Sequence, residues 1–99
     1  MDQNKEKVDE YKEEAMYDYA DKFINLANEL SKSDNSGSVG VGLRYAAARY
    51  CAFEASLQTG NLNEDMDKHL EFFVNAFTNM LRMNLEEYSK IQLFDKNPG

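Results

Sequence analysis

Apolar residues recur every three or four positions in two long segments of the chain, which is the spacing of one face of an α-helix. In the first segment they are Val8, Tyr11, Ala15, Tyr19, Phe23, Leu26, Ala27 and Leu30. In the last segment they are Met66, Leu70, Phe73, Phe77, Met80, Leu81, Leu85 and Tyr88. The pattern predicts amphipathic helices over residues of about 7–31 and 62–92.

The segment between them is rich in alanine and runs without a breaker from Leu43 to Gln58. It predicts a middle helix over about 39–59. The polar, glycine-containing run 31–40 predicts the loop before this helix, and Gly60 stands where a helix C-cap is expected. Asn61 or Asn63 can cap the last helix, and Asn61 has Glu64 at the spacing of a capping box.

Three helices without any strand-like alternation predict an all-α fold, most economically an antiparallel three-helix bundle. The length of 99 residues suits a single domain over 1–99. We expect fraying over residues 1 to about 6. The segment 93–99, which ends in Asn-Pro-Gly, predicts a loose tail.

The middle helix has two faces with few charges. One face is apolar and consists of Leu43, Ala46, Tyr50, Phe53 and Leu57, and the opposite face consists of Tyr45, Ala48, Arg49, Ala52 and Ser56. An exposed helix normally carries several charges on one side, so the second face is either covered within the bundle or offered to a partner. We hypothesise a symmetric homodimer through Tyr45, Arg49, Ala52 and Ser56, with burial inside the bundle as an equally open alternative.

The net charge of −7 disfavours binding to nucleic acid and to anionic lipid, so neither is an expected partner. No apolar run approaches the roughly 18 residues of a membrane-spanning helix. The charged N-terminal stretch lacks the apolar core of a secretory signal, and the single cysteine, Cys51, excludes an internal disulfide. These features predict a cytoplasmic protein in which Cys51 packs as a small residue.

The glycine-rich loop raises the question of phosphate binding. Gly37 and Gly42 have the separation of a Walker-type loop, but Leu43 and Arg44 follow where lysine and a hydroxyl are required, and the dinucleotide fingerprint lacks its third glycine. The favoured interpretation is that the glycines relax a turn while Ser36 or Ser38 caps the middle helix. An anion site formed by Gly40, Gly42 and Arg44 at the start of that helix stays open as an alternative.

Metal and catalytic signatures are weak. His69 and Asp65 could supply two ligands from one helix face, which does not close a metal site. The acidic run 61–72 fails as an EF-hand loop because Met66 and Phe72 occupy its glycine and glutamate positions. Cys51 has no base near it in the sequence, and Glu54, set among small apolar residues, is expected to be paired. We therefore predict no metal, no cofactor and no enzymatic activity.

The stretches YADKFINLAN (19–28) and LRYAAARYCAF (43–53) resemble a family of small all-helical bacterial proteins known only as a domain of unknown function. The matching positions are Tyr19, Ala20, Asp21, Phe23, Asn28, Tyr45, Arg49 and Phe53. The resemblance covers the first two helices and fades in the third. It implies a bacterial cytoplasmic origin and lends no catalytic residue, cofactor or partner.

Three of these positions suggest a link between the first and the middle helix. Asp21 or Asn28 beside the Arg49 guanidinium would form a polar network between the two helices. The functional variant of this hypothesis is a pocket of Tyr19, Tyr45 and Arg49 for a small anion.

The predicted function is a non-enzymatic helical interaction module that self-associates or binds a protein partner through the middle helix. The alternative is a small anionic-ligand binder or sensor at the start of that helix.

Overall fold

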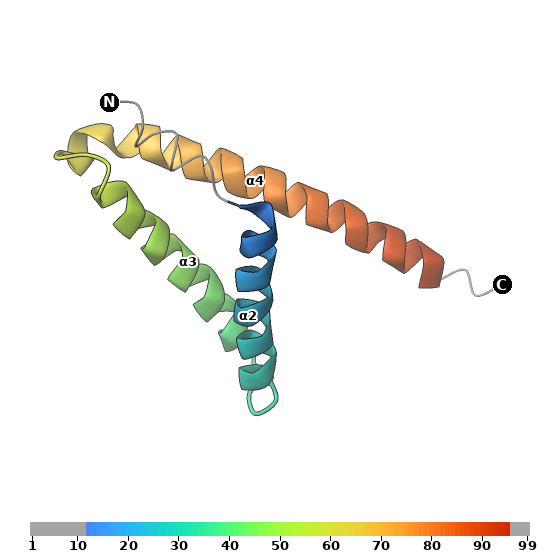
Figure 1. Ribbon diagram of the computed structural model, residues 1–99. Helices are drawn as coiled ribbons and strands as arrows, with labels where there is room; N and C mark the ends of the chain where they lie inside the picture. The colour runs from blue at the N-terminus through green and yellow to red at the C-terminus, as the bar shows by residue number, and fades with distance from the viewer. Residues whose placement is uncertain (1–11, 96–99) are drawn as a thin grey trace. The chain divides into compact units, whose positions relative to one another are not determined.

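The computed structural model describes residues 12–95, which form three α-helices (Figure 1). They are α2 (Glu13–Ser31), α3 (Ser38–Ser56) and α4 (Leu62–Asp95). Residues 12–95 contain no β-strand. The prediction of an all-α fold with three helices is confirmed, and the antiparallel packing of all three stays a prediction.

Two compact units make up the chain, and they divide between Ala48 and Arg49, inside the continuous helix α3. The first unit contains α2, the loop after it and the first part of α3, which run in opposite directions as a helical hairpin (Figure 1). The second unit contains the rest of α3, a short turn and α4. The single domain over 1–99 stays a prediction.

Helix α2 begins at Glu13, so the helix predicted over about 7–31 is not continuous through Lys12. Lys12, the residue before it, has an extended backbone (φ −90°, ψ 124°) and makes no side-chain cap. Glu13 and Glu14 stand in the first turn, where negative charge is favoured by the helix dipole. Residues 7–11 of the predicted helix, together with the predicted frayed residues 1–6, lie outside the described part of the chain. The end at Ser31 is where the periodicity placed it.

A hydrogen-bonded turn joins α2 to α3. The Asp34 carboxylate accepts hydrogen bonds from the amide of Ser36 (2.9 Å) and from its hydroxyl (2.7 Å). Gly37 then takes a left-handed conformation with φ +96°, which a residue with a Cβ adopts only with strain. The Ser36 hydroxyl accepts from the amide of Ser38 at 3.2 Å, so the predicted serine cap is confirmed. With this cap, α3 begins at Ser38, one residue before the predicted start.

The end of α3 differs from the prediction. The helix ends at Ser56, and the amides of Leu57 and Gln58 donate to the carbonyls of Glu54 and Ala55 at 3.1 and 3.0 Å. These tight i→i−3 bonds satisfy the last carbonyls without a glycine cap. Among residues 12–95, Gly37 is the only glycine with positive φ, so the predicted C-cap at Gly60 and the predicted helix end at 59 are wrong.

Side chains of the turn begin α4. The Asn61 side-chain oxygen accepts from the amide of Glu64 at 3.2 Å, which confirms Asn61 as the cap. The Thr59 hydroxyl accepts from the amide of Asn61 (3.1 Å) and donates to the carboxylate of Asp65 (2.6 Å). This Thr59–Asp65 bond joins the turn before the helix to the first turn of α4. The start of α4 is therefore capped by the side chains of Thr59, Asn61 and Asp65, whereas the predicted capping box used those of Asn61 and Glu64.

The last helix is longer than expected. It continues to Asp95, which makes it 34 residues long, or about 51 Å at 1.5 Å per residue. The predicted tail is therefore wrong for residues 93–95, and its remainder, 96–99, lies outside the described residues. No glycine or proline interrupts the sequence between Gly60 and Pro98, so nothing ends the helix earlier.

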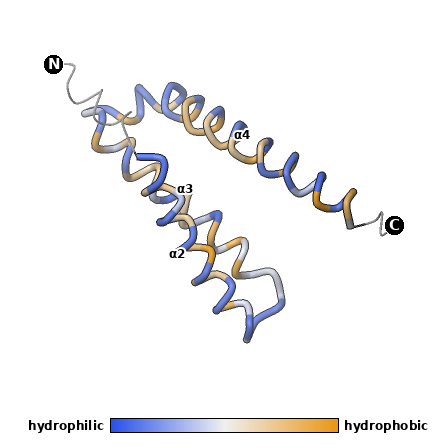
Figure 2. Tube along the Cα trace, turned by 45° about the vertical axis from the view of Figure 1, so that its right-hand side comes forward, coloured by the Kyte–Doolittle hydropathy of each residue, from blue (hydrophilic) through white to orange (hydrophobic). Residues whose placement is uncertain are grey.

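Large apolar side chains stay in contact with water along all three helices. Among the described residues only Ala55 is buried, at 4% exposure. Phe23, Phe53 and Phe77, one from the stripe of each helix, are 61%, 52% and 53% exposed. Apolar stretches recur along every helix in Figure 2. The three predicted helices thus form, while most of their apolar surface lacks cover.

Two glycines of the first unit should respond oppositely to alanine. Gly37→Ala is expected to lower the free energy of unfolding by about 1 kcal/mol, because φ +96° is strained for alanine. Gly42→Ala is expected to raise it by about 0.5–1 kcal/mol, because Gly42 is helical and a Cβ there meets no atom within 4 Å. Urea unfolding followed by circular dichroism, at one protein concentration, measures both. Equal effects would contradict the turn geometry.

The cap of α4 gives a second prediction. Asn61→Ala removes the acceptor for the Glu64 amide and is expected to lower the free energy of unfolding by about 1 kcal/mol. Asn63→Ala is the matched control, because Asn63 is exposed inside the first turn and makes no side-chain hydrogen bond among the described residues. Thermal unfolding of the two variants compares them. A control as unstable as Asn61→Ala would show that the cap is unimportant.

Candidate functional site

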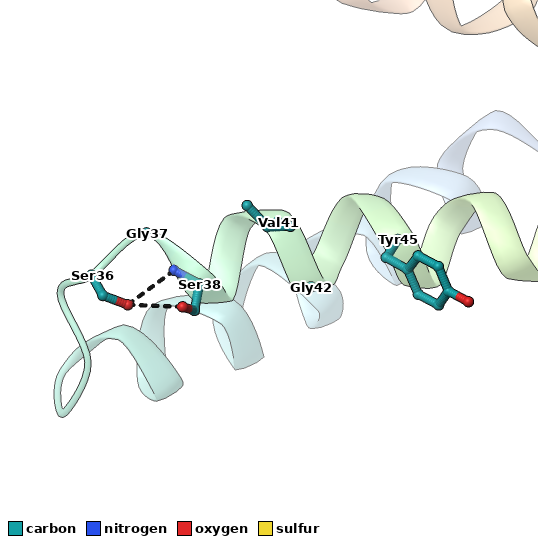
Figure 3. Close-up of a pocket in the computed structure, with 6 residues that line it drawn as sticks. All are labelled: Ser36, Gly37, Ser38, Val41, Gly42 and Tyr45. Atoms are coloured by element: carbon teal, nitrogen blue, oxygen red, sulfur yellow. Dashed lines mark hydrogen bonds between the residues drawn. The ribbon is translucent and has the colours of Figure 1, made fainter.

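A shallow surface hollow marks the start of α3 (Figure 3). It is lined by residues of the first unit, namely Ser36, Gly37, Ser38, Val41, Gly42 and Tyr45. The two serines are hydrogen-bonded to each other at one end, while the Tyr45 ring lies at the other end and points away from them (Figure 3). Tyr45 is 65% exposed. The polar groups of this hollow therefore do not converge on one point.

Of the three residues of the proposed anion site, Gly40 and Arg44 lie close together. Gly40 and Gly42 are inside α3, and the Arg44 guanidinium lies 3.5 Å from where a Cβ on Gly40 would be. The turn before the helix already contains a carboxylate, because the Ser36 hydroxyl and amide hold the pKa of Asp34 below its usual value. An ionised Asp34 opposes the binding of a further anion here. Anion binding by Gly40, Gly42 and Arg44 stays a prediction.

The hypothetical interface residues are all exposed. Tyr45 belongs to the first unit, and Arg49, Ala52 and Ser56 belong to the second. The Ser56 hydroxyl donates to the carbonyl of Phe53 at 2.7 Å, so this hydroxyl already has a partner within its own helix. Their exposure leaves these residues available for contact, and the interface itself stays a prediction.

The opposite face of α3 is exposed as well. Tyr50, Phe53 and Leu57 are 52–71% exposed, and the Tyr50 and Phe53 rings contact one another with centroids 5.8 Å apart. The residues of this helix that are covered in its second half are Cys51 and Ala55, one helical turn apart. The predicted packing of Cys51 as a small residue agrees with this, while the covered position of Ala55 was not predicted. Their small size, which permits close approach of another helix, was the available signal.

The predicted polar network joins residues of different units. Asp21 and Asn28 lie on α2 in the first unit, and Arg49 lies on α3 in the second. All three side chains are exposed. Tyr19, which was predicted to line an anion pocket with Tyr45 and Arg49, is 61% exposed. The network and this pocket stay predictions.

Two titratable side chains of α3, Cys51 and Glu54, interact electrostatically. Burial raises the pKa of the Cys51 thiol above its usual value, and the negative charge of Glu54 raises it further. Glu54 itself is exposed, so the reason for expecting it to be paired no longer holds. A raised pKa keeps the thiol protonated and slow to react near neutral pH, which agrees with a packing role for Cys51.

Metal-binding groups are dispersed over the described residues. No group of three or more His, Cys, Asp or Glu residues within 12–95 could hold a metal ion. The carboxylate of Asp65 accepts a hydrogen bond from the Thr59 hydroxyl at 2.6 Å in the cap of α4, one turn before His69.

Within residues 12–95, no helix has the length and apolar character needed to cross a bilayer.

Comparison with known proteins identifies a family. The sequence profile described as "Protein of unknown function (DUF3144)" matches residues 16–89. The chain belongs to the DUF3144 family. The match extends through α3 and most of α4, so the expectation that the resemblance fades in the third helix is corrected. No curated protein and no solved structure matches the chain. The description of DUF3144 assigns no function.

The coupling between Cys51 and Glu54 predicts thiol reactivity. Glu54→Gln removes the negative charge that disfavours the thiolate, so the pKa of Cys51 should fall and alkylation should become faster at pH values below that pKa. Glu54→Asp, which keeps the charge, is the matched control. The rate of reaction with a thiol reagent as a function of pH measures this. An unchanged pH profile for Glu54→Gln would exclude the electrostatic effect.

Proposed function

We propose that this DUF3144 protein is a non-enzymatic helical interaction module that binds another protein chain, either a second copy or a different protein, through α3. The observation that carries the proposal is the exposure of apolar side chains along the helices. Residues 12–95 bury one apolar side chain, Ala55, while Phe53 and Tyr50 on α3 stay more than half exposed. Such surfaces on soluble proteins mark sites of association.

The free energy available from covering these side chains is large. Complete burial of one leucine or phenylalanine side chain contributes about 1.5–3 kcal/mol, and roughly half of that remains available when the side chain is half exposed. The remaining gain of about 0.75–1.5 kcal/mol per side chain is comparable with the side-chain ordering cost of roughly 0.5–1.5 kcal/mol each at an interface, so association needs several such side chains together. Contact with another chain supplies the cover that the described residues lack.

The composition of α3 suits it to such contact. Ala46, Ala47, Ala48 and Ala52 are small and let another helix approach closely. Tyr45 and Arg49 are of the residue types that are enriched at the energetic centres of interfaces. Both are exposed. The helix thus combines room for close packing with anchors that can fill a partner's surface.

The chemistry of the chain supports a non-enzymatic role. General acid–base or nucleophilic catalysis needs titratable groups that converge with shifted pKa values. Asp34 is already bound by Ser36, and the raised pKa of Cys51 keeps its thiol protonated and slow to react near neutral pH. They lie in different units. Binding rather than bond-breaking is the activity that these features favour.

The test is the mass of the full chain in solution. We expect sedimentation equilibrium to give a mass above the 11.4 kDa of one chain, and Arg49→Glu to weaken association by about 10–100-fold, as for an interface anchor. Lys22→Glu is the matched control, since it makes the same change of charge at an exposed position of α2. Should Arg49→Glu associate as tightly as Lys22→Glu, contact through the face of α3 that carries Tyr45, Arg49, Ala52 and Ser56 would be disproved.

A further inference from the structure

A second surface with a regular pattern runs along α4. From Val74 onwards, residues alternate at spacings of three and four, which is the a and d pattern of a coiled coil. These positions are Val74, Phe77, Leu81, Asn84, Tyr88 and Ile91, and we call them the α4 seam. The five apolar members are 44–66% exposed. The seam is thus an exposed stripe that is apolar at every position except Asn84.

The chain covers a different and shorter stripe of α4. The part-buried residues of the helix are one turn apart on a single face, namely Leu62, Asp65, His69, Phe73 and Ala76. From Phe77 to Phe94 every side chain is exposed. At 1.5 Å per residue, α4 is about 51 Å long, and its part-buried stripe ends at Ala76, less than halfway along it. Most of the seam lies in this uncovered part.

The distribution of charge along the chain favours a second copy of the same chain as the partner of the seam. The chain has net charge −7. Residues 72–99 contain three acidic and three basic residues, namely Glu86, Glu87, Asp95, Arg82, Lys90 and Lys96. Their net charge is zero, so the whole −7 belongs to residues 1–71. A basic partner would be attracted to the acidic part instead, whereas two copies of this acidic chain can approach one another through the neutral segment without net repulsion.

We propose that the α4 seam pairs with the same seam of a second copy in an antiparallel coiled coil. Antiparallel pairing brings Val74 against Ile91 of the second copy, Phe77 against its Tyr88, and Leu81 against its Asn84. This inference rests on the proposed function, because it takes the chain to act by binding another protein chain. The inference identifies the partner as a second copy of this chain. It places the contact on a surface separate from the face of α3 that carries Tyr45, Arg49, Ala52 and Ser56, which we call the α3 face.

The antiparallel direction follows from charge as well. The first turns of α4 carry Glu64, Asp65, Asp67 and Glu71. Parallel pairing would bring these acidic turns of both copies to the same end, where they repel one another. Antiparallel pairing separates them to opposite ends, and it also sets the two helix dipoles in the favourable opposed direction.

The area of the seam is sufficient for a weak specific dimer. An aromatic side chain presents about 150–250 Å², and roughly half of each apolar seam side chain is exposed. With flanking residues, pairing then buries roughly 600 Å² per chain, near the lower end of specific protein interfaces. The described residues of α4 provide this area without any rearrangement of the helix.

Asn84 explains why the pairing would be specific rather than tight. Its side-chain amide donates to the carbonyl of Met80 at 2.8 Å, one turn back on the same helix. A polar residue at a seam position costs stability and restricts the registers in which two helices can pair. Replacement of Asn84 by leucine should therefore strengthen the dimer, an effect that a merely structural role in one chain does not produce.

Sedimentation equilibrium of the full chain tests the seam. We expect twice the mass of the 11.4 kDa chain, loss of the dimer in Leu81→Glu, and about tenfold tighter association in Asn84→Leu. Asn79→Glu is the matched control, because it places the same charge on the side of α4 away from the seam and should leave the dimer intact. Circular dichroism verifies that each variant keeps its helices.

Disulfide trapping tests the direction of pairing. In a Cys51→Ser background, chains with Val74→Cys are mixed with chains with Ile91→Cys and oxidised. Antiparallel pairing places these two cysteines side by side, while two copies of residue 74 lie about 25 Å apart along the axis. We expect the mixed disulfide alone. A disulfide formed by the Val74→Cys chain with itself would overturn the antiparallel arrangement.

The outcomes separate this inference from the proposed function. If Arg49→Glu weakens association while Leu81→Glu leaves it unchanged, the α4 seam is overturned and contact through α3 stands. If only Leu81→Glu weakens association, the seam is supported and contact through α3 fails. A wild-type chain that sediments at 11.4 kDa throughout the micromolar range overturns the seam dimer.

Discussion

The constraint on which this structure depends is that three amphipathic helices carry more apolar surface than the described residues cover. Helices of this length are stabilised in water mainly by packing of their apolar faces, because propensity alone is marginal over 19 residues. Within residues 12–95, Ala55 is the one buried apolar residue. The remaining apolar faces gain stability only when another surface removes them from water. Contact with another chain, as proposed above, would therefore stabilise the helices as well as serve the proposed function.

Local interactions define where each helix begins and ends, and they do so largely with polar side chains. Ser36 and Asp34 order the turn before α3, and Asn61 begins α4. Each of these bonds joins residues at most three positions apart, so it can form before any tertiary contact. The helices are thus well defined as units even though their apolar faces are open. A module of this kind can present preformed helices to a partner, which lowers the ordering cost of binding.

Charge and apolar surface are distributed differently along the chain, and this difference gives the two candidate surfaces different characters. The α3 face combines small residues with Tyr45 and Arg49, which suits close contact with a partner that offers a carboxylate or an aromatic ring. The α4 seam lies in a segment without net charge, which suits contact between copies of an acidic chain. Membership of the DUF3144 family spans both helices, so both surfaces lie within the matched residues 16–89 except for the last seam position, Ile91.

The sequence by itself determined the helices, because their signals are local. Apolar spacing predicted the first and last helices, and the unbroken alanine-rich run predicted the middle one. Asn61 and Ser36 were among the cap candidates, and the missing lysine and third glycine argued against a phosphate loop. It did not determine that α3 ends at Ser56, because tight i→i−3 bonds can close a helix without a glycine, nor that α4 passes residue 92. Only the tertiary structure decided which faces are covered. Ala55 is buried and Cys51 is part-buried, while Phe53 and Tyr45 are exposed. This difference depends on contacts between residues far apart in the chain, which the spacing of apolar positions within a single helix does not specify.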